Sequence, residues 1–369
     1  MSDVFMRTLC ASALVLGGIC VEAEAASTFE TYGQSFSTIA PPPPDFAGGS
    51  FGTVGDALAD GRLIAVTGLD VFLETSAGSG VFSVVATLDS ASVGGSTDPG
   101  FVRVSPDGSK IAIGAGFAKP LMVVDTSVIT GGGSPVLNGS NTSIYNVAHT
   151  SATWTHDSAG LAIANGNFGS PAYVDLLDIT SSTATPSITR LVDGVQGASG
   201  GVAFDASGNL YVGNGFANGV GSDTGAIHMF TAGMLAGGTP LDFEGEGLFV
   251  TDMLSANDLT FDQAGNMFVG GGDFFGSGDG GYVGIVNHET LQDLIDGALG
   301  GPIDLLDPTQ VRTLDPEGTS SAFYNIIFND ATGELILSDG SSWHVTIPAP
   351  ASALLFAALL GVGRRSRAA

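Results

Sequence analysis

The amino-acid sequence predicts an all-β protein, a β-propeller of six blades that are each a four-stranded antiparallel sheet, with seven blades as the alternative. Three observations support this prediction. A strand–turn–strand unit recurs through residues 51–347, its turn glycines lie 47 to 68 residues apart, and the 56 glycines among 369 residues lack the three-residue period of collagen. Such an interval has room for four short strands, which is the content of one propeller blade.

The repeated unit is an alternating apolar strand, a tight turn that contains glycine, and a second apolar strand. Its clearest copies begin at Gly201 (GVAFDASGNLYVG) and Leu259 (LTFDQAGNMFVG). In such turns Asp or Asn hydrogen-bonds to the local backbone, and glycine accepts a positive φ. The predicted turn glycines are Gly61, Gly108, Gly160, Gly208, Gly265 and Gly333.

The segments between the turns predict the rest of each blade. Third strands are expected at 121–125, 173–178 and 226–230, in the order of antiparallel meanders. Residues 287–298 have helical spacing and predict a short helix in an outer loop. A seventh blade would have to lie within 273–325. The last unit is short of strands, so a strand from 28–39 is expected to pair with 343–347 and close the ring.

Residues 1–25 have the pattern of a secretory signal peptide. Arg7 precedes an apolar stretch over 8–21, and small residues at Ala23 and Ala25 predict cleavage before Ala26. The two cysteines of the chain both fall within this segment, so the mature protein would be exported without disulfides. Residues 26–50 then form an N-terminal segment with a proline-rich connector.

Residues 348–369 combine three features in order. Pro348, Ala349 and Pro350 come first, an apolar run over 353–363 follows, and Arg364, Arg365 and Arg367 end the chain. A short apolar run followed by arginines is expected to stop at the inner membrane with its arginines in the cytoplasm.

This arrangement resembles the PEP-CTERM sorting tail of Gram-negative bacteria, although Ala349 stands where the family has Glu. The resemblance covers the tail alone. It implies an exosortase-type processing enzyme, transient contact of the tail with the inner membrane, and a final location at the cell surface or in an extracellular matrix.

The charge balance excludes some function classes. With 37 acidic against 10 basic residues, the net charge of −27 makes nucleic acid an unsuitable partner, because phosphate contacts require Lys and Arg. Divalent cations are the more natural counter-charge. The sequence lacks a His-x-x-x-His pair, and no cysteine lies beyond residue 25, so neither a zinc-binding histidine pair nor a cysteine nucleophile is present in the mature chain.

The repeated units resemble the blades of NHL, YVTN and gluconolactonase-type propellers. In such propellers the residues just before each innermost strand surround the mouth of the central channel. The polar residues at these places are Asp56, Asp98, His149, Asn257, Asp258 and Asn325.

In gluconolactonase-type propellers acidic and amide side chains at these places hold one divalent ion. The resemblance therefore implies a channel site for Ca²⁺, whose hard oxygen ligands would suit it. The candidate ligands are Asp98, His149, Asn257, Asp258 and Asn325. Against this, residues 199–201 offer no ligand at the corresponding place. The alternative is that these side chains cap strand ends and bind channel water.

Two glycine-rich loops, 218–225 and 270–281, form a second candidate for calcium. Their acidic residues are Asp223, Asp273 and Asp279. The spacing matches neither an EF-hand nor a nonapeptide calcium repeat, so surface loops with incidental acidic residues are the alternative.

The leading functional hypothesis is a secreted propeller, associated with the cell envelope or extracellular matrix, with a non-catalytic binding or structural role. A polysaccharide or an envelope protein would be its partner. The rival hypothesis is a divalent-metal-dependent lactonase or related hydrolase, with Asp258 as general base or metal ligand. The two differ because metal-dependent hydrolysis requires convergent ligands with an open coordination position.

Overall fold

The computed structural model of the chain describes residues 32–39, 53–95, 97–116, 119–165, 172–180, 186–218, 224–272, 283–305, 307, 310–314, 323–339 and 342–348. The predicted signal peptide lies outside these residues, as do Asp223, Asp273, Asp279 and the tail beyond Pro348.

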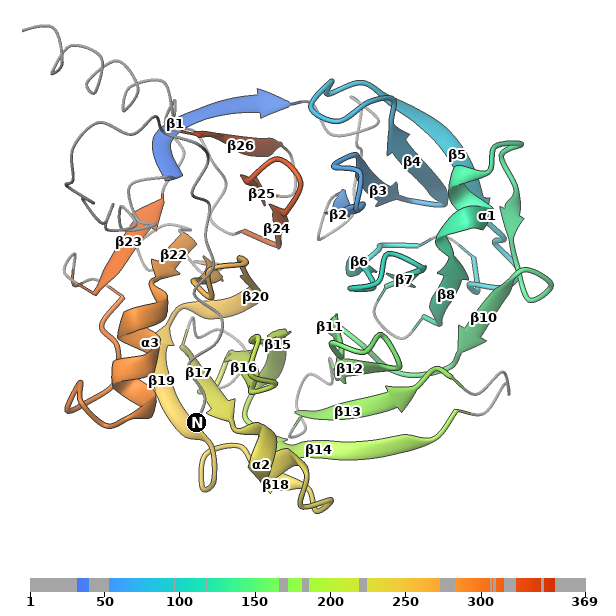
Figure 1. Cartoon of the computed structure of the whole chain (residues 1–369). Coiled ribbons are helices and arrows are strands. Elements are labelled where there is room, and N and C mark those ends of the chain that lie inside the picture. Colours follow the sequence, from blue (N-terminus) through green and yellow to red (C-terminus); the bar gives the residue numbers. More distant parts are fainter. Residues whose placement is uncertain are drawn as a thin grey trace, which may run out of the picture.

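Six small sheets stand around a central channel like the blades of a propeller (Figure 1), which confirms the predicted fold. The innermost strands are β2 (Val54–Ala57), β6 (Phe101–Val104), β11 (Ser151–Trp154), β15 (Ala198–Phe204), β20 (Ser255–Phe261) and β24 (Asn325–Asn329). The second strands are β3 (Leu63–Thr67), β7 (Lys110–Gly114), β12 (Gly160–Ala164), β16 (Leu210–Gly215), β21 (Met267–Gly272) and β25 (Glu334–Ser338). The third strands are β4 (Asp70–Glu74), β8 (Leu121–Asp125), β13 (Ala172–Asp178), β17 (Gly225–Phe230), β22 (Val283–Val286) and β26 (Trp343–Pro348). The fourth strands are β5 (Phe82–Leu88), β10 (Thr142–Tyr145), β14 (Ile188–Val195), β19 (Leu248–Met253), β23 (Val311–Leu314) and β1 (Tyr32–Ile39).

Two details differ from the expectation of four strands per blade. The short strands β9 (Val136–Leu137) and β18 (Leu241–Asp242) run parallel to β5 and β14, so two sheets have five strands. The alternative of a seventh blade within 273–325 is wrong, because β22 and β23 complete the blade that starts with β20.

The described residues include three short helices, which lie in the connections between strands. They are α1 (Thr126–Thr130), α2 (Ala232–Leu235) and α3 (His288–Ile295). The predicted helix is confirmed as α3, and Asn287 caps it by accepting a hydrogen bond from the amide of Thr290 at 2.7 Å. None of the helices in the described part of the chain has the length and apolar character that crossing a membrane requires.

The ring closes as predicted, by pairing the two ends of the propeller. β1 is antiparallel to β26 and completes the blade β1-β26-β25-β24. The buried Trp343 of β26 also reaches the first blade, where its Nε1 donates to the carbonyl of Thr53 at 3.3 Å. A Cβ on Gly55 would lie 2.7 Å from the Trp343 ring, so glycine makes this contact between the first and last blades possible.

The repeated turns adopt the expected conformation with one exception. Gly61, Gly108, Gly208, Gly265 and Gly333 all have positive φ. In the third turn Ser158 has the positive φ (59°), and Gly160 begins β12 instead. The prediction for Gly160 was therefore wrong by two positions: the amide of Ser158 closes the turn on the carbonyl of Thr155, as that of Gly208 does on Asp205.

Candidate functional site

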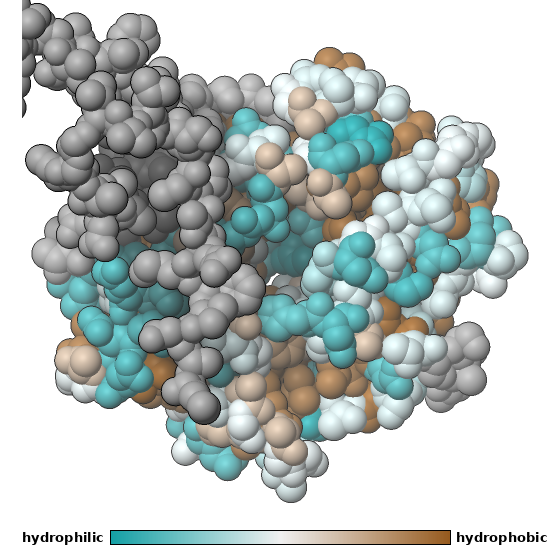
Figure 2. Space-filling model, in the orientation of Figure 1, coloured by the Kyte–Doolittle hydropathy of each residue, from teal (hydrophilic) through white to brown (hydrophobic). Residues whose placement is uncertain are grey.

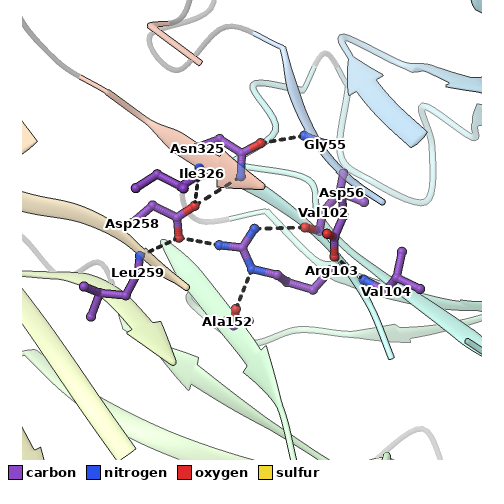
Figure 3. Close-up of polar contacts among 10 residues, drawn as sticks. All are labelled: Gly55, Asp56, Val102, Arg103, Val104, Ala152, Asp258, Leu259, Asn325 and Ile326. Atoms are coloured by element: carbon purple, nitrogen blue, oxygen red, sulfur yellow. Dashed lines mark hydrogen bonds and ion pairs between the residues drawn. The ribbon is translucent and has the colours of Figure 1, made fainter. Parts of the chain in front are cut away.

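The centre of the channel holds a buried carboxylate with four hydrogen-bonding partners. Asp258 on β20 is 1% exposed. Its Oδ1 pairs with Arg103 Nη2 and accepts from the amide of Leu259 (3.0 Å). Its Oδ2 accepts from Asn325 Nδ2 (3.1 Å) and from the amide of Ile326 (2.8 Å) (Figure 3). Both oxygens are therefore engaged, each by two donors.

The Arg103 side chain crosses the channel from β6 to reach this carboxylate. Its Nε donates to the carbonyl of Ala152 on β11 (3.0 Å) and its Nη1 to that of Val102 (3.1 Å). Only 13% of the side chain is exposed. A buried charge in a protein has to be paired and hydrogen-bonded. Arg103 and Asp258 each provide the opposite charge that the other requires when buried.

Two further residues extend the network to the first blade. Asn325 Oδ1 accepts from the amide of Gly55 (2.9 Å), and Asp56 Oδ2 accepts from the amide of Val104 (2.7 Å). Burial raises the pKa of the half-buried Asp56 to about 6, while the nearby Arg103 guanidinium opposes that rise. The contacts thus link five innermost strands: β2, β6, β11, β20 and β24.

The sixth innermost strand, β15, contributes close backbone packing in place of a side chain. A Cβ on Gly200 would lie 1.7 Å from the carbonyl oxygen of Ala256, and one on Gly201 would lie 2.6 Å from the amide of Leu259. Only glycine permits the backbones of β15 and β20 to approach this closely. Residues 199–201 offer no ligand because this stretch is used for packing.

The geometry of these residues does not fit a divalent ion. Such an ion requires several convergent oxygen ligands, whereas both oxygens of Asp258 are engaged by protein donors and the Arg103 guanidinium supplies the positive charge. Across the described residues no three His, Cys, Asp or Glu side chains gather closely enough to hold a metal ion. A calcium ion in the channel stays a prediction that the hydrogen bonding of Asp258 does not favour.

The five predicted ligands occupy three different environments. Asp258 and Asn325 contact each other at the centre. Asn257 lies beside them but donates from Nδ2 to the carbonyl of Phe323 (2.9 Å). His149 is buried, with its ring edge-to-face against Phe101 and its Nδ1 2.9 Å from the carbonyl of Val147. Burial lowers the pKa of His149. Asp98 precedes β6 and lines neither cavity of the channel.

Two cavities open on either side of the Arg103–Asp258 pair. The first, of about 330 Å³, lies where the innermost strands start. The residues that line it are Gly100, Arg103, Thr150, Ser151, Ala198, Ser199, Gly200, Gly215, Phe216, Ser255, Ala256, Asn257, Asp258 and Tyr324. The second, of about 670 Å³, lies at the turns where the innermost strands end, and Arg103 also lines it. We call the first cavity the strand-start cavity and the second the turn-end cavity. Figure 2 shows hydrophilic residues beside the central hollow of the ring.

Arg103 is the residue of this candidate site that the sequence analysis did not identify. It stands between Val102 and Val104 in an alternating strand, a place typical of a side chain that faces away from the core. Its partner Asp258 is 155 residues away in the sequence. One available signal was the scarcity of basic residues, because the chain has only 10.

Comparisons with known proteins support the fold. No family model matches the sequence, and no curated protein matches it. Among solved structures, a gluconolactonase from Xanthomonas campestris is similar with a TM-score of 0.50 and 13% identity, covering 81% of this chain and 87% of that one. A chain of the mitotic checkpoint complex gives a TM-score of 0.50 at 14% identity, covering 92% of this chain and all of the other. At these identities the likeness shows the β-propeller fold alone, and the six sheets of this chain give the number of blades, as in propellers of the gluconolactonase type.

Proposed function

We propose that this chain is an exported binding propeller that holds a small molecule in its strand-start cavity without transforming it. The observation that carries the proposal is that protein donors occupy both carboxylate oxygens of Asp258, two donors on each oxygen. A general base must be within reach of a substrate proton and have an oxygen to accept it. Both oxygens of Asp258 already accept from Arg103, Asn325 and two backbone amides.

The cavity has the properties of a small ligand site. Its volume of about 330 Å³ is at the lower end of the range of about 300–1,000 Å³ that is usual for ligand pockets. Most of its wall is small or apolar, with a few hydroxyl and amide groups among them. Ligand pockets combine such a wall with a few polar groups that fix orientation.

The proposal includes a location at the cell envelope or in the extracellular matrix. The signal-like segment 1–25 and the sorting-like tail 348–369 support it. Pro348 is the last residue of β26 and pairs with Tyr32 of β1, so the tail begins where the folded ring ends. We expect fractionation of the native host, with mass spectrometry of the protein, to find an N-terminus at Ala26 and the protein outside the cytoplasm. An intact N-terminus in the cytoplasm would contradict this part of the proposal.

Two measurements separate binding from the lactonase alternative. The first is thermal unfolding of the purified protein with micromolar Ca²⁺, with other divalent ions, and after chelation. A ligand that binds only the native state raises its melting temperature. We expect no ion-specific shift at micromolar concentration. The second is an assay of lactone hydrolysis with the wild type and Asp258→Asn. A micromolar, calcium-specific shift together with hydrolysis that depends on Asp258 would overturn the proposal in favour of the metalloenzyme.

A further inference from the structure

The turn-end cavity is surrounded by one equivalent residue from each blade. This residue stands at the end of the innermost strand, four residues before the positive-φ position of the turn, or five in the last blade. The six residues are Ala57, Val104, Trp154, Phe204, Phe261 and Phe328, and all of them line the cavity. Four of the six are aromatic and come from β11, β15, β20 and β24, which follow one another around the ring (Figure 1). We call these four side chains the aromatic arc.

Most of the aromatic arc is not enclosed by the protein. Phe204, Phe261 and Phe328 are each only half-buried, although they belong to innermost strands. Trp154 is buried, with its Nε1 donating to the carbonyl of Arg103 at 2.9 Å. The cavity of about 670 Å³ is within the range of about 300–1,000 Å³ that is usual for ligand pockets. Apolar rings gathered around a cavity of this size indicate a binding surface.

The charges that line the cavity favour a cation. Its three carboxylates are those of Asp56, Asp262 and Asp330. Among the described residues of the wall the only guanidinium is that of Arg103, which is already paired with Asp258. Partial burial raises the pKa of the Asp330 carboxyl, and the nearby carboxylate of Asp262 adds to the rise. A bound cation would reduce this repulsion, whereas an anion would be repelled.

The hydrogen bonds of these carboxylates indicate which kind of cation fits. Asp56 accepts from the amides of Ala57 (2.8 Å) and Val104 (2.7 Å). Asp262 accepts from the amide (2.8 Å) and the side-chain nitrogen (2.7 Å) of Asn266. A primary ammonium is strongly hydrated and brings three N–H donors that need acceptors. A quaternary ammonium has no N–H group, and aromatic faces attract its charge.

We infer that the turn-end cavity binds a small quaternary ammonium compound against the aromatic arc, in the negative field of Asp56, Asp262 and Asp330. The methyl groups of such a cation contact the aromatic side chains, and the carboxylates balance its charge without giving up their hydrogen bonds. This is a second binding site, at the opposite end of the channel from the strand-start cavity. It goes beyond the proposed function, and the two sites can be tested separately.

The first test is calorimetric titration of the purified exported protein with choline and two matched compounds. In one, a tert-butyl group replaces the trimethylammonium group and removes the charge. The other, ethanolamine, keeps the charge on a primary ammonium. We expect choline to bind about 5- to 30-fold more tightly than its uncharged isostere, which is the size of cation–π attraction in a desolvated site, and more tightly than ethanolamine. Equal or tighter binding of the isostere would overturn the preference for a cation, and that of ethanolamine the preference for a quaternary one.

Variants of the aromatic arc test where the cation binds. Phe204→Leu and Phe261→Leu keep apolar bulk and remove the aromatic face, so each should weaken choline binding about 2- to 5-fold. Phe249→Leu is the matched control, because Phe249 is exposed on β19 and does not line the cavity. Melting temperatures close to that of the wild type show that the variants are folded. Choline affinity that is unchanged in both arc variants, or lowered equally in the control, would overturn the site.

Trp154 provides a readout that a purely structural role would not change. The chain has two tryptophans, and the other, Trp343, is buried and lines neither cavity of the channel. We expect choline to change the tryptophan emission of the wild type. Trp154→Phe should lose that change while calorimetry still detects binding. Choline binding without a change in emission would place the cation outside this cavity and overturn the inference.

Phosphatidylcholine vesicles carry the same trimethylammonium group on a lipid. A small compound as the occupant predicts that the protein binds choline and does not sediment with these vesicles. Sedimentation that choline abolishes would overturn the small compound in favour of a lipid head group. If choline does not bind at millimolar concentration, this inference fails, whereas the proposed function, which concerns the other cavity, is unaffected.

Discussion

The two ends of the central channel differ in charge and lining, although the same six innermost strands build both. In the wall of the strand-start cavity the charges of Arg103 and Asp258 cancel, and its remaining polar groups are hydroxyls and an amide. The turn-end cavity is twice as large and holds three carboxylates among aromatic side chains. Its carboxylates are those of Asp56, Asp262 and Asp330, and its aromatic side chains include Trp154, Phe204, Phe261 and Phe328.

The difference follows from what repeats in the sequence. Carboxylates of the repeated turns are used within the turns: Asp262 Oδ1 accepts from the amide of Asn266 (2.8 Å), and Asp205 Oδ1 accepts from that of Asn209 (2.9 Å). The strand starts vary from blade to blade, from Ser151 to Ala198 to Asn325. The polar residues at the turn-end cavity thus stabilise the repeated turns, whereas the residues at the strand-start cavity can vary and are available for binding.

Arg103 separates the two cavities, so the largest effect is expected from its removal. Arg103→Ala leaves the buried Asp258 carboxylate without its counter-charge and joins the cavities. Breaking a buried ion pair in this way costs about 3–5 kcal/mol of unfolding free energy. Urea denaturation measures the loss.

Lys110→Ala is the matched control for this experiment, because it removes an ion pair with Asp125 that is exposed at the surface. It should cost less than about 1 kcal/mol. Equal losses in both variants would show that the Arg103 bridge is not a special feature of the channel.

The second-largest loss of stability is expected where the glycines of β15 pack against β20. In Gly200→Ala the new Cβ would lie 1.7 Å from the backbone oxygen of Ala256, so one backbone must move. Overpacking of this kind costs about 1–3 kcal/mol. Gly139→Ala, where a Cβ meets no atom within 4 Å, should leave the urea midpoint nearly unchanged. A tolerated Gly200→Ala would mean that the strand-start cavity has room to relax.

The turn-end cavity predicts a smaller, pH-dependent effect through Asp56. Its pKa is raised by burial from 3.8 to about 6, so between these values the folded protein binds more protons at this group than the unfolded chain does. Its contribution therefore makes stability fall as pH rises from about 4 to 6 and stay reduced above that range. Asp56→Asn should remove this fall.

Melting temperatures of the wild type and Asp56→Asn from pH 4 to pH 8 measure the difference, in which the other titrating groups cancel. The advantage of the variant should grow through the window and then remain constant. A difference that does not change with pH would show that Asp56 has an ordinary pKa in the folded protein.

The sequence by itself determined the propeller. The repeated turns marked the second strands of all six blades and the innermost strands of five of them, the spacing predicted α3, and the shortage of strands in the last unit predicted that β1 closes the ring. These features depend on local periodicity and turn chemistry, which a single chain displays directly. In the third turn the positive φ belongs to Ser158, and a pattern that looks for glycine selects Gly160, two residues later.

Only the tertiary structure decided what the channel contains. Asp258 and Asn325 were recognisable as polar residues at strand starts, but Arg103, the partner of Asp258, looked like an ordinary outward residue of an alternating strand. Closure of the ring brings these residues together across separations of 155 and 67 positions. Hydrogen bonding and charge pairing at the centre depend on the distance between blades, and that distance is set by packing of the whole ring.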